Sequence, residues 1–231
     1  MYILPYEREI LANCLEVRKT IQQVVDERRR DPNAKERGDF LQIILEDETT
    51  KDNNELIVDE CLTFNFAGGT TSSVAGQNLI YLLCKHPHYF DQIRKEIDEQ
   101  IVQPYLKAQV AAGTLAPGQV VSDIELLDLL TFDNSGELTF FQQCYNEALR
   151  IQPPVNLSSL VKVMQECKCD TVTIRPDTIV SINMHRLCND PAEWFCPDSF
   201  MPERFDPKSP YYLTPAGKPR NPFSFSPYLG G

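Results

Sequence analysis

The most constraining feature of this sequence is an uncharged stretch in its first half. No Asp, Glu, Lys or Arg occurs between Cys61 and Cys84, and most residues towards the end of the stretch are apolar. The pattern predicts one long helix over residues 55–85, about 45 Å in length at 1.5 Å per residue. The dipeptide His86-Pro87 ends it, because a residue before proline is pushed out of the helical region.

The middle of this helix is made of small and hydroxyl-bearing residues. Residues 67–72 read Ala-Gly-Gly-Thr-Thr-Ser. Each glycine in a helix interior costs about 1 kcal/mol relative to alanine, so some group must need to come close there. The hydroxyl of Thr71 can bond the carbonyl of Ala67 one turn back and bend the helix. A flat cofactor with a small ligand suits such a patch; an ordinary core helix with a packing groove is the open alternative. A membrane span is disfavoured because the polar residues fall at mid-depth.

Composition limits the classes of function. The chain has 231 residues, 42% of them hydrophobic, which is enough for one large or two small domains with a buried core. A net charge of −11 disfavours nucleic acid as a partner, which requires a basic face. The eight cysteines form no CxxC pair and are interpreted as free thiols of a reducing compartment. Cys167 and Cys169 lack a second pair of metal ligands.

Periodicity and turn signals predict a mainly α-helical chain with a small β-sheet late in the sequence. Two capping boxes are expected at helix starts, in residues 122–125 and 139–142. The two expected strands would form a hairpin around residues 175–177. Beyond the long central helix, the expected helices are 5–30, 39–46, 88–109, 122–130 and 139–150, and the expected strands are 171–174 and 178–182.

Two charged residues in the last of these helices suggest a buried network. Glu147 and Arg150 are three residues apart and therefore face the same side. An exposed ion pair is the simple interpretation. Their helix is apolar, however, and a planar guanidinium suits a buried bidentate contact with a carboxylate. Arg204 could supply a further cation. A lone ExxR pattern is weak evidence by itself.

Several motifs follow one another in a specific order. They are residues 67–72, Glu147-Ala-Leu-Arg150 with Pro153-Pro154, His185-Arg186, Asp190-Pro191, Trp194, Pro197, Phe200, Pro202-Glu-Arg-Phe205 and Pro222-Phe-Ser-Phe-Ser-Pro-Tyr-Leu-Gly-Gly231. With these motifs in this order, the sequence closely resembles the haem-thiolate monooxygenases, the cytochromes P-450. The resemblance covers essentially all 231 residues and implies a partial cytochrome P-450 fold, from about the G helix to the start of the haem loop.

The resemblance implies how the single partial domain, residues 1–231, is organised. Residues 53–86 would be the I helix, which crosses the distal face of the haem in that family. The other segments would be G- and H-like helices in 1–52, J- and K-like helices in 88–151, a small β region in 155–185, and the PERF region with the start of the haem loop in 186–231.

In the family, the I helix carries the pattern Ala/Gly-Gly-x-acid-Thr-Thr/Ser. Ala67 and Gly68 match the part that lies against the cofactor. Thr71 matches the threonine that hydrogen-bonds iron-bound oxygen and helps to deliver protons. The acid position holds Thr70 instead. A hydroxyl can relay a proton through water but cannot supply one near neutral pH as a carboxylic acid can.

The resemblance assigns two further groups of residues. Glu147, Arg150 and Arg204 match the family's Glu-Arg-Arg network, a structural support of the haem-binding core. Tyr228 takes the aromatic place of the haem loop and Gly231 takes a glycine place. The arginine and the iron-ligating cysteine of that loop are expected two and four positions after Gly231. No metal ligand is therefore nominated among the eight cysteines.

The expected function is part of a haem-dependent monooxygenase that oxidises an apolar organic substrate with O2. Phe64 and Phe66, with the small-residue patch, would line the substrate pocket. An NADPH-dependent reductase or another electron donor would be the partner, and the cytosolic face of the endoplasmic reticulum membrane the location. The alternative is a non-catalytic helical fragment or incomplete gene model that lacks the haem thiolate and acts at most as an interaction module. By itself the chain is expected to be inactive.

Overall fold

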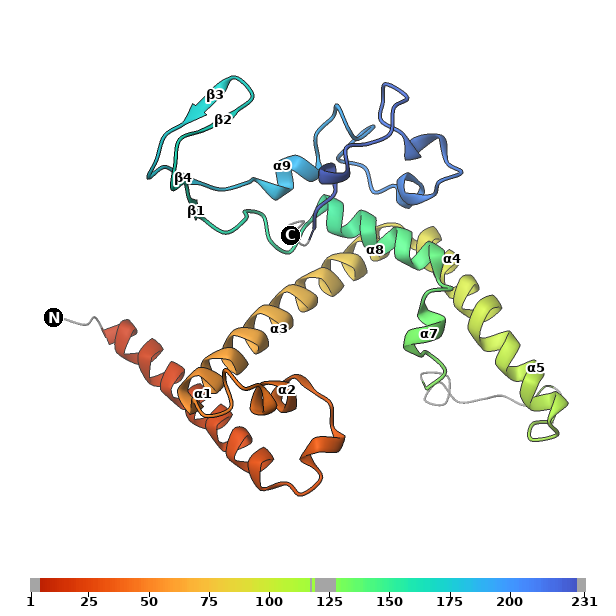
Figure 1. Cartoon of the computed structure of the whole chain (residues 1–231). Coiled ribbons are helices and arrows are strands. Elements are labelled where there is room, and N and C mark those ends of the chain that lie inside the picture. Colours follow the sequence, from red (N-terminus) through yellow and green to blue (C-terminus); the bar gives the residue numbers. More distant parts are fainter. Residues whose placement is uncertain (1–4, 117, 119–127, 228–231) are drawn as a thin grey trace. The chain divides into compact units, whose positions relative to one another are not determined.

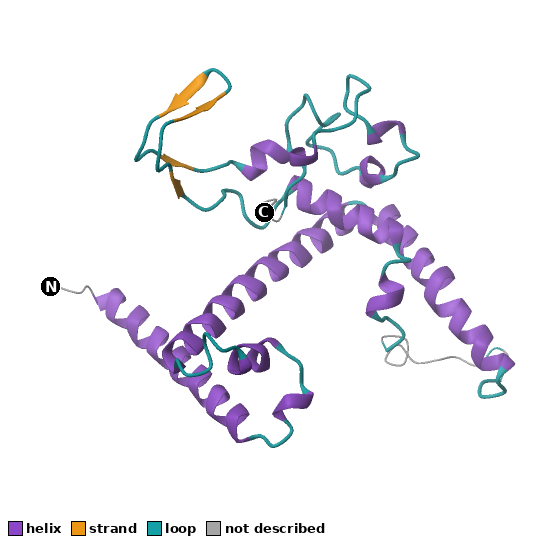
Figure 2. Cartoon of the chain, in the orientation of Figure 1, coloured by secondary structure: helices purple, strands orange, loops and turns teal. Residues whose placement is uncertain are grey.

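The computed structural model of the chain describes residues 5–116, 118 and 128–227. It divides into two compact units, Met1–Ser72 and Ser73–Gly231, and the boundary falls inside the long helix α3 (Asn54–Lys85). Each unit is therefore described by itself (Figure 1). The described residues are mainly helical with a few short strands, which confirms the predicted fold class (Figure 2). No helix in the described part of the chain is long and apolar enough to cross a membrane.

The first unit contains α1 (Pro5–Arg30), a 3-10 turn (Ala34–Glu36), α2 (Phe40–Glu46) and the beginning of α3. The bounds of α1, α2 and α3 agree with the predicted helices to within a residue. Asp39 caps α2, because its carboxylate accepts a hydrogen bond from the Gln42 amide at 3.0 Å. One small core joins the three helices; it consists of Val25, Ile44 and Ile57 with the partly buried Ile21, Phe40, Leu41, Leu45 and Cys61.

The second unit is built around the end of α3, α4 (Pro87–Ile97) and α8 (Thr139–Ile151). Between α4 and α5 (Gln103–Ala111) lies a π-helical segment (Asp98–Val102). Pro104 lies two residues after this segment. A proline in a helix has no amide hydrogen to donate, and its ring clashes with the preceding turn. The predicted helix over 88–109 is thus one helical run with a local bulge. The larger core consists of Leu79, Leu82, Leu83, Tyr89, Ile93, Cys144, Ala148 and Phe200.

The predicted hairpin around residues 175–177 is wrong. β3 (Val172–Ile174) pairs with β2 (Cys167–Cys169), whereas β4 (Ile179–Val180) pairs with β1 (Val161–Lys162). Both pairs are antiparallel, and Figure 1 shows β2 and β3 as one hairpin. The turn after β3 redirects the chain to β1 instead, because the Asp177 amide binds the carbonyl of Val163 at 2.8 Å. Asp177 has a φ of 64°, in the left-handed region.

The predicted capping boxes have different outcomes. The box at residues 122–125, and most of the short helix expected after it, lie outside the described residues. The box at 139–142 is wrong, because Leu138 caps α8 and makes no side-chain hydrogen bond there. Between the expected helices 122–130 and 139–150, the structure has a further short helix, α7 (Phe132–Ser135), which carries a capping box between Thr131 and Asn134. A short helix α9 (Met184–Cys188) precedes the irregular last segment.

Candidate functional site

The predicted contact between Glu147 and Arg150 exists and is buried. Both side chains project from α8 and have no exposed surface, 0% for each. Arg150 Nε donates to Glu147 Oε2 at 2.7 Å, and Nη2 donates to Oε1 at 2.8 Å. The guanidinium plane therefore meets the carboxylate in a bidentate contact, the strongest geometry for this pair. The simpler interpretation, an exposed surface ion pair, is wrong.

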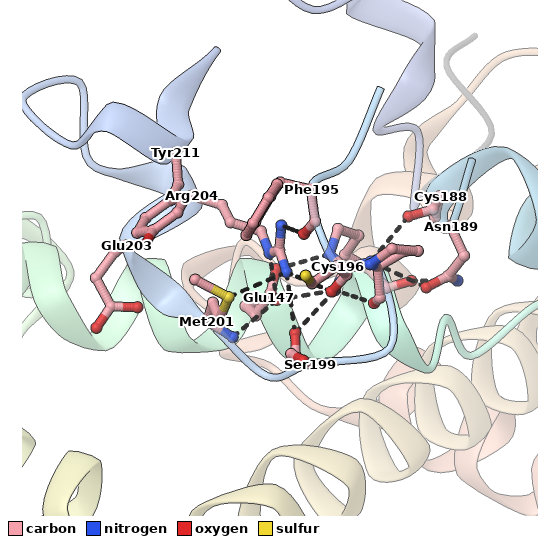
Figure 3. Close-up of polar contacts among 12 residues, drawn as sticks. Glu147, Cys188, Asn189, Phe195, Cys196, Ser199, Met201, Glu203, Arg204 and Tyr211 are labelled. Atoms are coloured by element: carbon pink, nitrogen blue, oxygen red, sulfur yellow. Dashed lines mark hydrogen bonds and ion pairs between the residues drawn. The ribbon is translucent and has the colours of Figure 1, made fainter. Parts of the chain in front are cut away.

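Arg204 completes the network from a distant segment. It lies in the 3-10 turn Pro202–Phe205, and its Nε donates to Glu147 Oε1 at 3.0 Å. The Met201 amide donates to the same oxygen at 2.9 Å. Figure 3 shows these contacts converging on Glu147, while the neighbouring Glu203 points away from them. One carboxylate thus joins α8 to the turn that carries Arg204, which is fully buried as well (0% exposed).

Two arginines face one carboxylate, so backbone carbonyls accept their remaining donors. Arg150 donates to the carbonyls of Cys188 at 3.1 Å and Pro197 at 2.7 Å, and to Asn189 Oδ1 at 2.9 Å. Arg204 donates to the carbonyl of Cys196 at 2.7 Å and to that of Phe195. Burial lowers the pKa of the Arg204 guanidinium, and the charge of Glu147 opposes that shift. Except for Cys188 at the end of α9, these acceptors lie in the loop between α9 and the Arg204 turn, which the two arginines therefore hold in place.

That loop contains a strained residue. Cys196 has a φ of 44°, a left-handed conformation that is uncommon for a residue with a side chain. The Cys196 carbonyl accepts two hydrogen bonds, one from Arg204 Nη2 at 2.7 Å and one from the Ser199 amide at 3.0 Å. Such backbone persists only where the surrounding contacts determine it. Here those contacts come from the buried arginine.

Helix α4 binds both elements of the network. The Glu96 carboxylate accepts hydrogen bonds from the amides of Phe140 at 2.7 Å and Phe141 at 2.9 Å, at the start of α8. Two turns earlier in α4, the Tyr89 hydroxyl donates to both carboxylate oxygens of Glu203, at 3.0 and 3.1 Å. Burial raises the pKa of Tyr89, and the Glu203 carboxylate raises it further. α4 therefore contacts the helix of Glu147 and the turn of Arg204 at once.

The small-residue patch of α3 is a second candidate site, and it lies in the first unit. The Thr71 hydroxyl donates to the Ala67 carbonyl at 2.8 Å, which confirms the predicted bond to the preceding turn. Among the described residues of the first unit, a Cβ placed on Gly68 or Gly69 would meet no atom of another segment within 4 Å. The patch is therefore open for close approach by another group.

Helical geometry divides the predicted residues of α3 between two faces. Phe64, Ala67, Gly68 and Thr71 have spacings of three and four and share one face. Phe64 is 57% exposed and stacks on Phe40 of α2, with ring centroids 4.1 Å apart. Phe66 and Thr70 lie four apart on another side of the helix, where Phe66 is 74% exposed.

The residues predicted for the haem loop, Tyr228 and Gly231, lie outside the described residues. All eight cysteines are free thiols. The described residues include no group of three or more His, Cys, Asp or Glu side chains that could hold a metal ion. Glu96, Tyr89 and Arg220 contribute to the second unit but were not singled out from the sequence, because their partners are far away along the chain or are backbone groups.

The comparisons identify the class of protein. The sequence model of the family described as Cytochrome P450 matches residues 1–228, and the chain belongs to this family. It is 25% identical over 245 residues to "Cytochrome P450 4F8" of Homo sapiens, covering 100% of this chain and 42% of that protein. It is 30% identical over 220 residues to "Cytochrome P450 3A9" of Rattus norvegicus, covering 88% and 38% respectively.

Solved structures show the same fold. The structure titled "Retinoic acid bound cyanobacterial CYP120A1" matches with a TM-score of 0.72 at 22% identity, covering 94% of this chain and 43% of that one. The predicted resemblance and the predicted partial cytochrome P450 fold are therefore confirmed. The chain spans about two fifths of the length of the curated relatives it matches, from 38% to 42% for the two named above.

Proposed function

We propose that this chain is part of a haem-dependent monooxygenase that oxidises an apolar organic substrate with O2. The observation that carries the proposal is the family match over residues 1–228. The buried contacts of Glu147 with Arg150 and Arg204 add support, because they join the segments that the resemblance places around the cofactor. In this role the three residues support the haem-binding core and take no part in the chemistry.

The proposal keeps the order of segments that the resemblance implies. α1 and α2 correspond to G- and H-like helices within 1–52, and α3 corresponds to the I helix within 53–86. α4 to α8 correspond to J- and K-like helices within 88–151. Residues 155–185 form the small β region, and 186–231 contain the PERF region and the start of the haem loop. The uninterrupted α3 over Asn54–Lys85 is what a helix crossing a cofactor requires.

The open patch of α3 fits one face of a flat prosthetic group. Ala67 and Gly68 share a face of the helix, and no described atom of another segment of the first unit lies within 4 Å of a Cβ placed on Gly68. A haem with a cysteine thiolate ligand, when bound here, would supply activation of O2 for insertion of one oxygen atom into the substrate, while two electrons from the donor and two protons would convert the other to water. In this proposal Tyr228 and Gly231 belong to the haem loop, and the ligating cysteine follows Gly231.

Thr71 and Thr70 have separate roles in the proposal. The Thr71 hydroxyl is oriented by its bond to the Ala67 carbonyl at 2.8 Å, which leaves its oxygen free to accept a hydrogen bond on the open face. It would hold a proton donor or water there. Thr70, in the place of an acid, can pass a proton between waters but has none to give near neutral pH.

Substrate and partners follow from the same proposal. Phe64 shares the face of Thr71 and supplies apolar surface to a small apolar substrate; Phe66 does so from another side of α3. Electrons come from an NADPH-dependent reductase or another donor. The endoplasmic reticulum membrane, on its cytosolic side, is the proposed location by resemblance.

The test uses the coding sequence downstream of Gly231. We expect it to encode Arg-x-Cys-x-Gly within a few codons, and the completed protein to show a thiolate-type Soret band in its reduced carbon monoxide difference spectrum. Cys14→Ser is the matched control and should retain the band, because Cys14 is an exposed thiol of α1. A completed protein that contains bound haem but lacks the band contradicts the proposal and favours a non-catalytic interaction module.

A further inference from the structure

We propose that Trp194 and Arg220 form a stacked pair that positions residues 220–227 on the buried Glu147–Arg150–Arg204 network. Only its last step, the effect on a cofactor loop, rests on the proposed function. The pair is distinct from the carboxylate contacts, since it acts through an aromatic face and backbone carbonyls.

Trp194 lies at the centre of an aromatic group from three segments. The side chain is 1% exposed, and its backbone amide binds the Asp190 carbonyl at 2.9 Å. Its ring lies 5.9 Å from that of Phe205 and 6.4 Å from that of Phe225, centroid to centroid. Phe205 follows Arg204 directly, and Phe225 belongs to the segment 220–227. The indole therefore joins the network turn to residues 220–227.

The indole acts through its face. The Cζ atom of Arg220 lies 4.3 Å from the ring centroid, and that of Arg150 lies 5.1 Å away. Both distances are within the range of about 6 Å for a cation–π interaction. The indole Nε1 is buried and makes no hydrogen bond to the part of the chain described here. Its donor therefore does not explain why a tryptophan occupies this position, whereas its π face does.

Arg220 is a third cation beside a single buried carboxylate. Its Nη2 donates to the carbonyls of Arg204 at 2.9 Å and Tyr211 at 2.5 Å. Burial lowers the pKa of Arg220, and the nearby Arg204 charge lowers it further. A charge kept in such surroundings needs compensation, and the two carbonyls provide it together with the Trp194 face and the more distant Tyr212 ring, whose centroid is 5.6 Å from Cζ. Lysine cannot reproduce this arrangement, because an ammonium group lacks the planar stacking surface.

The contacts of the next residue extend the same connection. The Asn221 amide donates to the Glu193 carboxylate at 3.0 Å, and the Asn221 Oδ1 accepts from the Phe223 amide at 3.0 Å. That second bond caps the 3-10 turn Pro222–Ser224. Two neighbouring residues of one segment thus contact two neighbouring residues of the other, because Arg220 stacks on Trp194 and Asn221 binds Glu193. The pair fixes the direction in which the chain proceeds towards position 228.

The competing explanation is that Trp194 is only a large apolar side chain. Four single variants of the chain separate the two: Trp194→Phe, Trp194→Leu, Arg220→Lys and Arg220→Met. Phenylalanine keeps an aromatic face and omits the unpaired Nε1, whereas leucine keeps only apolar volume. We expect the side chains at positions 194 and 220 to stay energetically coupled when position 194 is phenylalanine, and to lose that coupling when it is leucine.

The measurement is a double-mutant cycle on the unfolding equilibrium in urea, followed by far-ultraviolet circular dichroism. In the cycle of Trp194→Leu with Arg220→Met we expect a coupling of about tenfold in the equilibrium constant. In the Trp194→Phe background, phenylalanine should keep more than half of this coupling with Arg220, compared on a logarithmic scale of the equilibrium constant. Equal loss in the phenylalanine and leucine variants, or purely additive effects, would overturn the proposal. If a variant does not unfold cooperatively, hydrogen exchange of the Asn221 amide gives the answer: faster exchange supports the pair, and unchanged exchange contradicts it.

A second arm uses the protein completed by its downstream sequence. We expect Trp194→Leu to lose a larger fraction of the thiolate-type Soret band than Trp194→Phe at equal protein concentration. If the unsubstituted protein shows no such band, the proposed function fails, while the cycle still decides whether the pair exists. If the band is present and equal in both variants, the effect of the pair on the cofactor loop is refuted.

Discussion

The Glu96 carboxylate accepts a hydrogen bond from the Phe140 amide at 2.7 Å, although the two residues are 44 positions apart. With a second bond from the Phe141 amide at 2.9 Å, it fills the place of a capping side chain at the start of α8. A helix N-terminus leaves its first amides without partners and carries a partial positive charge. The first amides of α8, which its own N-cap residue Leu138 leaves without a side-chain partner, thus receive that partner from α4.

Glu96→Ala should therefore destabilise the chain by about 1–2 kcal/mol, the usual cost of losing a helix cap. Glu96→Gln should cost less, because the amide oxygen can still accept one of the two bonds while its charge is lost. Urea unfolding at neutral pH measures both. The control is Glu99→Ala, because Glu99 is an exposed residue of the same helical run and forms a surface ion pair with Lys95 at 3.7 Å. Equal effects at positions 96 and 99 would contradict the capping role.

Glu147→Gln should have the largest effect of any single carboxyl substitution in the second unit. It leaves the buried charges of Arg150 and Arg204 without a carboxylate, and breaking a buried pair in this way costs about 3–5 kcal/mol. Urea unfolding followed by circular dichroism measures the loss. Glu137→Gln, an exposed position, should change stability by less than about 0.5 kcal/mol. A Glu147→Gln chain as stable as the control would show that the network is not needed for folding.

Tyr89→Phe tests the second contact of α4. It removes the hydroxyl that donates to Glu203 at 3.0 Å and should cost about 1.5–3 kcal/mol, as for hydrogen bonds to charged groups. The raised pKa of Tyr89 means that the folded state favours the protonated hydroxyl. Its contribution is thus present below the ordinary tyrosine pKa and is lost as the pH rises above it. Tyr81→Phe, at an exposed position of α3, is the control for removing a hydroxyl. The prediction fails if both variants lose the same stability.

The sequence predicts local features of this chain well and long-range ones poorly. α1 and α3 were predictable because their apolar patterns and their ends at Asp31-Pro32 and His86-Pro87 are local. The hairpin was mispredicted because β3 and β4 each pair with a strand further back, and no turn signal encodes that choice.

The site follows the same rule. The ExxR spacing places Glu147 and Arg150 together, but their burial depends on segments that arrive later in the chain. Arg220 could not be found from the sequence, because its partners are two aromatic faces and two backbone carbonyls.

The Asp39 carboxylate makes the stability of the first unit depend on pH in the acid range. It accepts two hydrogen bonds from Arg28, at 2.6 and 2.7 Å, and one from the Gln42 amide. The Arg28 contact, with the amide, lowers the pKa of Asp39 from 3.8 to about 2. Because the folded pKa is below the unfolded one, the contribution is complete above the unfolded value and is lost as the pH falls towards about 2.

Asp39→Asn should accordingly flatten the acid limb of the stability profile. Between pH values of about 4 and about 2, the unsubstituted chain should lose more stability than the variant. Urea midpoints measured across that range give the difference. Asp52→Asn is the control, since Asp52 is exposed in the turn before α3. Parallel acid limbs for the Asp39 variant and the unsubstituted chain would show that the Arg28 contact does not persist in solution.

Thr71 provides the test of the chemistry proposed for α3. In the completed protein, Thr71→Ala removes the hydroxyl that now donates to the Ala67 carbonyl, and oxygen consumption should become uncoupled from product formation. Thr71→Ser keeps the hydroxyl and should retain most of the coupling. The ratio of product formed to oxygen consumed measures both. Thr70→Glu should leave haem binding intact and raise that ratio, because a carboxyl group can supply the proton that a hydroxyl cannot. Unchanged coupling in Thr71→Ala would refute the role given to Thr71, even if haem binding and the thiolate-type spectrum are normal.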